Sequence, residues 1–289
     1  LTFVATANAI SYTGAVPVMV DVDPNTLCID PVAISNAITK KTRAIMPVHL
    51  YGHPSDMDKI NDIAKQYNLF VIEDAAEAIG SKYKGKTVGG LSDFGVFSFY
   101  GNKSMTTGEG GMITTNSEEL YNYAKYLRDH AMDKEKRYFH TEIGYNYRMT
   151  NIQAAMGVAQ LERIDEILDH RVKLLLWYKN NINQSSTVRL NFEAEWAKNT
   201  NWMICLEIDC LNHSKKETLM QRLKSKGIDV RPYFHPMSSM PMYKSEINPI
   251  SYLKSNIGLN IPTYFDLTEK DVIYISTIIN DELKEIENI

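Results

Sequence analysis

The sequence predicts an α/β protein with a large, mainly parallel sheet, followed by a smaller α+β part. Short apolar runs alternate with amphipathic stretches through the first hundred residues, which is typical of strand–helix–strand units. A long helical pattern then begins at residue 150, and shorter strand and helix patterns follow it. The length of 289 residues suits one large or two modest domains.

Four apolar runs in the first hundred residues are expected to be buried strands. They are rich in β-branched or aromatic residues and are bounded by glycine, proline or polar residues. The runs are Val16–Val22, Arg43–Leu50, Leu69–Glu73 and Val96–Tyr100. A helix is expected after the second run, since Met57, Ile60 and Ala64 form one apolar face. Another helix is expected to begin within Asp74–Ala78.

A long helix is expected to connect the two parts of the chain. Thr150 and Gln153 form a capping box, and the helix is predicted to run to about Asn183. One apolar stripe continues through Leu161, Ile164 and Leu168. We therefore place a large domain at residues 1–183 and a small α+β domain at residues 184–289.

The second part shows shorter patterns. Trp202–Cys210 and Ile228–Arg231 are predicted strands, and Lys216–Lys226 is a predicted helix that ends at a glycine. Thr268, with Asp271 three residues later, is expected to begin the final helix.

Composition excludes several classes of protein. A net charge of −4 argues against a nucleic-acid binder, which needs concentrated lysine and arginine. Apolar runs stay shorter than the ~20 residues of a membrane span, so no membrane partner is expected. Three cysteines, an odd number, fit a reducing compartment, and we expect a cytoplasmic protein. Cys205, Cys210 and His213 are too few and wrongly spaced for zinc, so no metal site is expected.

Three polar segments follow predicted strands, where open α/β sheets place their ligands. They are Glu73–Glu77, Ser98–Lys103 and Thr107–Gly111. An aspartate at one strand end and a lysine just past another are what a pyridoxal phosphate site requires. The lysine binds the cofactor aldehyde, and the aspartate keeps the pyridine nitrogen protonated. Taken alone, the same residues also fit a solvated lysine, a helix cap and a tight glycine turn.

Four motifs, in this order along the chain, resemble the DegT/DnrJ/StrS family of nucleotide-sugar aminotransferases. They are Glu73–Ala78, Ser98–Lys103, Thr107–Gly111 and Gly144–Met149. The resemblance extends from residue 1 to the C-terminal helix. It implies the fold-type I aminotransferase architecture, with a three-layer α/β/α large domain. Within the family, the chain most resembles the members that form GDP-perosamine, through Ile45–Gly52, Arg148–Ala155 and Arg231–Met237.

The resemblance assigns roles to five residues around the cofactor. Lys103 would be the Schiff-base lysine and the proton shuttle, and Asp74 would hold the pyridine nitrogen. Ser98 would bond the cofactor phosphate, and Phe3 would stack on the pyridine ring. Glu77 stands where many relatives carry glutamine or histidine facing the O3′ of the cofactor. A carboxylate beside a phenolate is unfavourable unless one of them is protonated.

Four further residues complete the set of candidates. Asn146 would reach the cofactor phosphate of the neighbouring subunit, which implies a homodimer with shared active sites. Arg148 would contact the shared site or the nucleotide, or form a salt bridge beside the long helix. His235 would line the sugar-nucleotide pocket or be an ordinary loop histidine. His49 lies in an apolar strand, where core packing is favoured.

The resemblance implies a reaction and a partial chain. L-glutamate would donate an amino group to GDP-4-keto-6-deoxy-D-mannose, giving GDP-perosamine, a precursor of O-antigen in lipopolysaccharide. Members of the family carry a further N-terminal part before the segment that matches Leu1–Phe3. The chain is therefore expected to be a fragment without half of its phosphate cradle.

Alternatives to this reaction stay open. The first is an aminotransferase for another keto sugar, linked to UDP or dTDP. A sugar dehydratase of the same family would carry histidine at the lysine position, so Lys103 argues against it. A further alternative is a non-catalytic protein on the same fold, or an inactive fragment.

Overall fold

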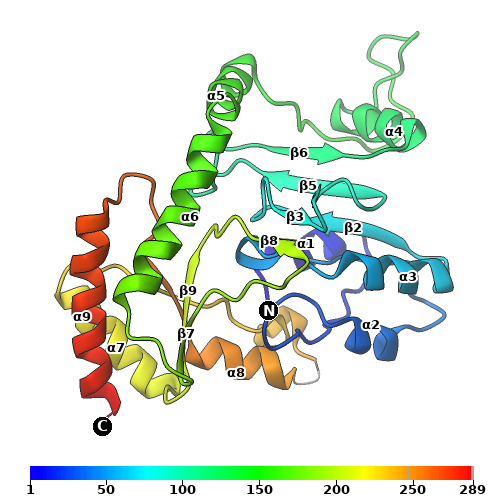
Figure 1. The fold of residues 1–289 in the computed structure, drawn as a ribbon. Helices are drawn as coiled ribbons and strands as arrows, with labels where there is room; N and C mark the ends of the chain where they lie inside the picture. The colour runs from blue at the N-terminus through cyan, green and yellow to red at the C-terminus, as the bar shows by residue number, and fades with distance from the viewer. Residues whose placement is uncertain (246–247, 288–289) are drawn as a thin grey trace.

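The computed structural model describes residues 1–245 and 248–287 (Figure 1). A four-stranded sheet in the first part has the order β1-β2-β5-β6. Its strands are β1 (Ala44–Ile45), β2 (Phe70–Asp74), β5 (Phe94–Ser98) and β6 (Gly111–Thr114). The first three are parallel to one another, and β6 is antiparallel to β5. The predicted α/β class with a mainly parallel sheet is confirmed.

Four helices accompany this sheet. They are α1 (Ala5–Tyr12), α2 (Pro31–Ala37), α3 (Met57–Tyr67) and α4 (Glu118–Arg128). The predicted face of α3 is correct: Met57, Ile60 and Ala64 are buried against β1 and β2. The helix ends at Asn68, which adopts the left-handed conformation with φ +53°. α2 begins at a side-chain cap, since the Asp30 carboxylate accepts from Val32 N–H.

Two predicted strands are wrong in whole or in part. Val16–Val22 forms no strand; it contributes one isolated bridge, between Val22 and Ile29. The run lacks a neighbouring strand to bond its backbone, and Val16 and Val18 are exposed. Arg43–Leu50 keeps only β1 as a strand.

The strand predicted at Arg43–Leu50 is short for a local reason, because its backbone pairing with β2 is interrupted. Pro47 has no N–H to donate, although its carbonyl accepts from Asp74 N–H at 2.8 Å. Val48 forms a single parallel bridge to Asp74, and the chain then enters a 3₁₀ turn, η1 (Leu50–Gly52). The other two predicted strands exist with shifted ends, as β2 and β5.

The helix predicted to begin within Asp74–Ala78 is also wrong. The segment makes two successive turns instead, in which Ala78 N–H bonds the Ala75 carbonyl and Ser81 N–H bonds the Ala78 carbonyl. Gly80 adopts a φ of +80°, which ends any helical course.

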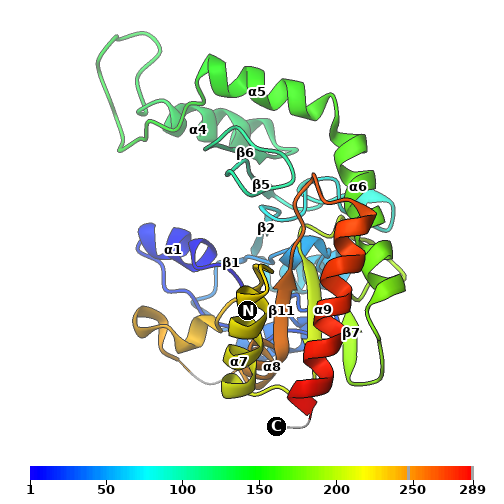
Figure 2. The same ribbon diagram turned by 90° about the vertical axis from the view of Figure 1, so that its left-hand side faces the viewer.

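The long helix expected over residues 150–183 is two helices, α5 (Asn151–Leu161) and α6 (Ile164–Asn181). The predicted capping box at Thr150 and Gln153 is confirmed. Arg163 interrupts the ladder, with φ −109° and ψ 14°, and its N–H bonds the carbonyl three residues earlier. In Figure 2, α5 turns away from the direction of α6 at this point.

The second part is built on an antiparallel sheet with the order β10-β11-β9-β7. Its strands are β7 (Val188–Leu190), β9 (Ile204–Ile208), β10 (Arg231–Pro232) and β11 (Gly258–Ile261). Its helices are α7 (His213–Ser225), α8 (Pro249–Ile257) and α9 (Glu269–Glu287). The predicted strand at 202–210 corresponds to the shorter β9. The strand predicted at 228–231 is wrong except at Arg231, where β10 begins. Thr268 and Asp271 bond each other's backbone N–H and begin α9 as predicted.

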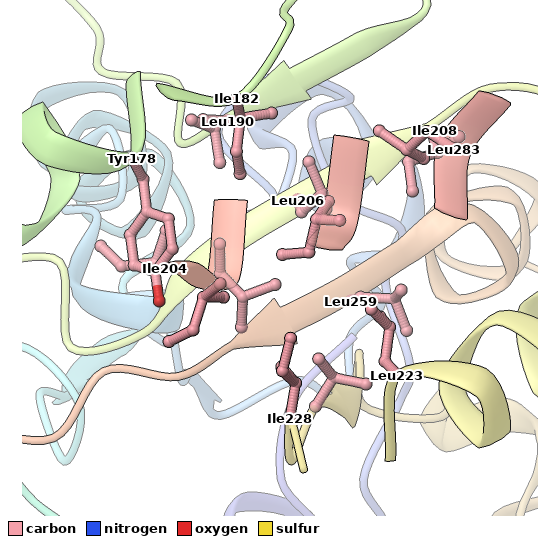
Figure 3. Close-up of a cluster of buried hydrophobic side chains, with 14 of the residues drawn as sticks. Tyr178, Ile182, Leu190, Ile204, Leu206, Ile208, Leu223, Ile228, Leu259 and Leu283 are labelled. Carbon is pink, nitrogen blue, oxygen red and sulfur yellow. The ribbon is translucent and has the colours of Figure 1, made fainter. Parts of the chain in front are cut away.

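The largest core cluster lies on one face of this sheet. Figure 3 shows Ile204, Leu206 and Leu259 from β9 and β11 packed with Tyr178 of α6 and with side chains of the covering helices. α6 packs along α9, so the second half of the long helical region is part of this core. The domain boundary at 183–184 stays a prediction.

A small third sheet joins the two parts. Its order is β4-β3-β8, with β3 (Lys82–Tyr83), β4 (Lys86–Thr87) and β8 (Ala197–Lys198). Gly52 allows the segment that follows β8 to approach closely. The φ of Gly52 is +101°, and a Cβ at this position would lie 2.7 Å from Asn199 Oδ1. Two short 3₁₀ turns, η2 (Met237–Ser239) and η3 (Pro241–Tyr243), complete the described elements.

A second contact between the two parts is an apolar cluster around Tyr51 and Trp202. It includes the buried thiols of Cys28 and Cys205. In the described residues no helix is long and apolar enough to cross a membrane.

Candidate active site

A cavity of about 1570 Å³ opens where β5 ends and the second part of the chain meets the first. Ser98, at the end of β5, lines it together with Lys103, Glu77 and Phe3. Four of the five residues predicted around a cofactor therefore share one cavity. The volume exceeds the usual size of about 300–1,000 Å³ for a small-molecule pocket, so it has room for more than one ligand.

Lys103 lies in the loop after β5. Its N–H bonds the Tyr100 carbonyl at 3.0 Å, and its Nζ lies 4.0 Å from the centroid of the Trp202 ring. Burial lowers the pKa of Lys103, although the carboxylates of Glu77 and Asp74 oppose this shift. A lysine with a lowered pKa is more often deprotonated and is therefore a better base and nucleophile.

Trp202 was missed as a site residue by sequence reasoning, which assigned it only to a strand. It precedes β9, is 3% exposed, and donates its indole N–H to the Asn102 carbonyl at 2.9 Å. The ring of Tyr51 stacks on it with centroids 6.4 Å apart. The second part of the chain thus holds the residue before Lys103 in place.

Asp74 ends β2, one strand away from Ser98. Its Oδ2 accepts from Thr6 Oγ1 at 2.7 Å, and its Oδ1 accepts from Ala76 N–H at 3.1 Å. These two bonds fix the carboxylate. Thr6 lies on α1, and no feature of the sequence near residue 6 pointed to this contact.

Glu77 is a buried acid, 4% exposed, whose Oε2 accepts from Tyr51 N–H at 2.8 Å. Burial raises its pKa to about 7, against the lowering effects of Lys103 and the Tyr51 N–H, while Asp74 adds to the rise. Glu77 is therefore protonated in a large fraction of molecules at neutral pH, which is the condition for placing it beside a phenolate oxygen.

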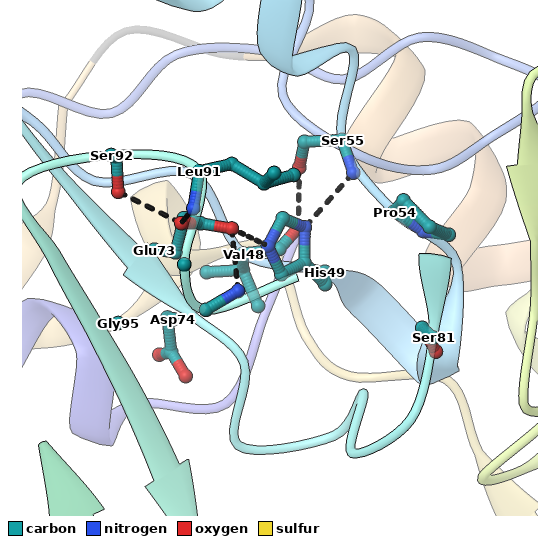
Figure 4. Close-up of polar contacts among 12 residues, drawn as sticks. Val48, His49, Pro54, Ser55, Glu73, Asp74, Ser81, Leu91, Ser92 and Gly95 are labelled. Atoms are coloured by element: carbon teal, nitrogen blue, oxygen red, sulfur yellow. Dashed lines mark hydrogen bonds and ion pairs between the residues drawn. The ribbon is translucent and has the colours of Figure 1, made fainter. Parts of the chain in front are cut away.

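Glu73 has a structural role beside this site, although it belongs to the same polar segment. Its carboxylate is fully buried and accepts from Gly89 N–H, Leu91 N–H, Ser92 Oγ and His49 Nε2 (Figure 4).

His49 is a core residue, as favoured from the sequence. It is fully buried, and its Nδ1 accepts from Ser55 N–H at 2.9 Å. Because Nδ1 is an acceptor, the ring proton lies on Nε2, and His49 is a neutral donor to Glu73. This pair anchors the strand end that carries Asp74.

Ser98 and Phe3 are accessible from the cavity. Ser98 Oγ accepts from Tyr100 N–H at 3.3 Å, and its hydroxyl proton stays available for another acceptor. Phe3 is 55% exposed, with its ring 5.8 Å from that of Phe234. The loop beyond Lys103 reverses through Gly108 and Gly110, both at positive φ, which confirms the expected tight turn.

Asn146, Arg148 and His235 do not line this cavity. Asn146 is exposed and forms a backbone bridge with Asp129. Arg148 Nη1 pairs with Asp129 Oδ1 at 3.2 Å, which is the salt bridge considered for it. His235 is exposed in the loop before η2. The functional roles of these three residues stay predictions.

The second part of the chain supplies cavity residues that sequence reasoning also missed. Arg171 of α6 is the most unusual, being 6% exposed. Among residues 1–245 and 248–287, no group of three or more histidine, cysteine or carboxylate side chains could hold a metal ion.

The sequence profile of the DegT/DnrJ/EryC1/StrS aminotransferase family matches residues 1–280. The chain belongs to this family. It is 46% identical to the GDP-perosamine synthase of Escherichia coli O157:H7, over 97% of the chain and 77% of that protein. It is 45% identical to the GDP-perosamine synthase of Caulobacter vibrioides, over 94% of the chain and 74% of that protein.

Solved structures of the family share the fold. The pyridoxal phosphate form of the sugar aminotransferase Spr1654 from Streptococcus pneumoniae is 26% identical, with a TM-score of 0.92. The match covers 99% of this chain and 79% of that one. The expected aminotransferase architecture is thereby confirmed, and the chain is an aminotransferase of the DegT/DnrJ/EryC1/StrS family.

Proposed function

We propose that the protein is a pyridoxal phosphate-dependent aminotransferase that converts GDP-4-keto-6-deoxy-D-mannose to GDP-perosamine, with L-glutamate as amino donor. The carrying observation is the arrangement of Lys103, Glu77 and Ser98 in one cavity, with Asp74 at the neighbouring strand end. The name shared by the two relatives described above supports the choice of sugar nucleotide.

The residues present fit pyridoxal phosphate. Lys103 is a partly desolvated amine, and Asp74 is a carboxylate fixed by two donors. Ser98 offers a hydroxyl proton to a phosphate, and Glu77 offers a proton to a phenolate oxygen. When bound, the cofactor supplies the aldehyde that carries the amino group and the ring that accepts electrons.

Lys103 and Asp74 divide the proton chemistry between them. The Nζ of Lys103, once unprotonated, removes the proton from the donor carbon and returns a proton in the second half of the reaction. The Asp74 side chain would hold a ring nitrogen of the cofactor in its protonated form. The Thr6 hydroxyl orients the Asp74 carboxyl group by donating to its Oδ2. Trp202 closes one side of the lysine and excludes water from it.

A homodimer with shared sites belongs to the same proposal, in the cytoplasm. Asn146 would contact the cofactor phosphate of the partner subunit. Exposed apolar side chains near Asn146 support a protein-covered surface in this region. They lie on β6, on α5 and in the loop before α5: Met112, Ile113, Ile143, Tyr145, Tyr147, Ile152 and Met156.

The deciding experiment is turnover of GDP-4-keto-6-deoxy-D-mannose with L-glutamate and pyridoxal phosphate, followed by mass spectrometry and NMR of the product. We expect an amine in place of the keto oxygen. The UDP- and dTDP-linked keto sugars are the comparison substrates. Turnover of one of these but not of the GDP sugar would overturn the nucleotide assignment. If the protein binds the cofactor but turns over none of these sugar nucleotides, the proposed enzymatic function is overturned.

A further inference from the structure

Arg171 is a buried cation in the cavity wall without an acidic partner among the described residues. It lies on α6 with 6% of its surface exposed. Burial is what lowers its pKa, to about 10, and no neighbouring carboxylate counters the shift. Buried arginines in proteins are normally paired with an acid. An anionic ligand would supply the negative charge that is missing at this position.

The hydrogen bonds of Arg171 hold one end of its guanidinium and leave the other end free. Nη1 donates to the carbonyl of Trp202 at 3.0 Å and to the carbonyl of Thr263. Nε is sealed from solvent and has no partner. Nη2 also lacks a partner within residues 1–245 and 248–287, yet it is not among the sealed atoms. The donors of Nη2 are thus available at the wall of the cavity.

The other cations of the cavity already face acids. Arg163 pairs with Glu166 at 2.9 Å, and Arg231 pairs with Asp229 at 2.7 Å. The lysine of the site faces two carboxylates. In the described part of the wall, Arg171 is the cation whose charge is uncompensated.

Arg171 and the reacting lysine, Lys103, both contact Trp202. Trp202 accepts from Arg171 through its carbonyl and contacts Lys103 through its ring. Arg171 and Lys103 thus contact the same residue and line the same cavity. With Nη1 anchored, the donors of Nη2 are held in a fixed position from which they can bond an oxyanion.

We propose that Arg171 binds an oxyanion of the substrates: the side-chain carboxylate of a dicarboxylic amino donor, or a phosphate of the sugar nucleotide. Both ligands offer negatively charged oxygens that the free donors of Nη2 can bond. The proposal rests on the proposed function and adds to it the residue that selects the charge of the ligand.

Two measurements separate the two sources of the oxyanion. The first is the rate of the half-reaction with L-glutamate and with L-glutamine, which has the same shape without the charge. The second is calorimetric titration of GDP into cofactor-free protein, which needs no activity. Arg171→Met removes the charge, and Arg171→Lys keeps it while losing the anchored Nη2 donors. Tyr178→Phe is the matched control, since Tyr178 on the same helix donates to the adjacent Pro262 carbonyl but does not line the cavity.

For a donor carboxylate, we expect Arg171→Met to lower the L-glutamate rate constant by about tenfold or more and to leave L-glutamine nearly unchanged. For a phosphate, the affinity for GDP falls by a similar factor instead. Arg171→Lys should show a smaller loss in the same measurement. Tyr178→Phe should change neither.

The proposal is overturned if both Arg171 variants fold, by their melting curves, and neither ligand is bound less well. It is also overturned if L-glutamate, L-glutamine and GDP are affected equally, which would show a structural role. If wild-type protein transaminates no sugar nucleotide, the proposed function fails. The donor and GDP measurements still decide the role of Arg171 in that case.

Discussion

The amine of Lys103 lies over the ring of Trp202, and the indole N–H of the same tryptophan donates to the carbonyl of Asn102. Trp202 therefore contacts both the reactive amine and the backbone that carries it. The ring face attracts the protonated amine, whereas burial favours the neutral one. The carboxylates of Glu77 and Asp74 add to the attraction for the protonated form, so the protonation of Lys103 in the cofactor-free protein is a balance of all these effects.

Replacing Trp202 separates its two contacts. Trp202→Phe keeps the ring face and loses the N–H donor, whereas Trp202→Leu loses both. We expect the pKa of Lys103 to be lower in the leucine variant than in the phenylalanine variant, because the cation–π attraction is absent. The pH dependence of amine acylation at Lys103, followed by mass spectrometry, measures this. Equal pKa values in the two variants would contradict the role of the ring.

Removal of the Lys103 amine should abolish transamination. We expect Lys103→Ala to lower the turnover number by at least about a thousandfold, since the variant has no base at this position. Borohydride should fix the cofactor to the peptide that contains residue 103 in the wild type and not in the variant. Appreciable turnover by the alanine variant would refute the assignment of Lys103.

Thr6 should contribute to cofactor binding through Asp74. Thr6→Val keeps the shape of the side chain but removes the hydroxyl that donates to Asp74 Oδ2. We expect cofactor affinity to fall by about tenfold or more, since a hydrogen bond to a charged group is worth about 1.5–3 kcal/mol. Fluorescence titration with pyridoxal phosphate measures the change, and Thr6→Ser should retain most of the affinity. An unchanged dissociation constant for Thr6→Val would remove Thr6 from the site.

Glu77 should make the cofactor-free protein less stable as the pH rises. Its folded pKa is raised from 4.5 to about 7. Its contribution to stability is thus fully present below pH 4.5 and is lost as the pH rises through about 7. Glu77→Gln should remove this dependence and gain on the order of 3 kcal/mol relative to wild type between pH 4.5 and pH 8. Urea unfolding at pH 5, 6, 7 and 8 tests this; parallel curves for the two proteins would contradict it.

Glu73 should have the opposite pH dependence. Burial works against its ionised form, but the bonds from His49, Gly89 and Leu91 lower its pKa below the ordinary 4.5. Its stabilisation is therefore complete above pH 4.5 and is lost as the pH falls through the lowered value. Glu73→Gln should reduce the free energy of unfolding at pH 7 by about 3 kcal/mol, because a buried network is broken. Its acid denaturation should be less steep than that of wild type, and an equally steep acid transition would argue against this role.

The sequence allowed prediction of the parts of the site that follow strands. Asp74 and Ser98 end neighbouring parallel strands, so their positions follow from sheet geometry alone. Lys103 follows from the same argument, since it lies five residues beyond Ser98 in the same loop. These residues depend on local patterns, and local patterns can be read along the chain.

The contacts that depend on distant segments could not be predicted. Thr6, Arg171 and Trp202 meet the site only because three separate elements converge, and none carries a local motif. The failure of the predicted strand at Val16–Val22 has a related cause, since an apolar run becomes a strand only beside a partner. The break at Arg163 escaped notice because no glycine or proline marks it, and Leu161, Glu162 and Arg163 are good helix formers.

The pairing of β3 with β8 constrains the order of folding. Residues 82–83 cannot complete their sheet until residues 197–198 have been synthesised, because β8 is their antiparallel neighbour. The Lys84 N–H also bonds the Trp196 carbonyl, and Ser81 bonds Thr200 through their hydroxyls. Such long-range pairing slows folding. During translation, the polypeptide therefore carries an unpaired strand edge, open to chaperones or to aggregation, until β8 leaves the ribosome.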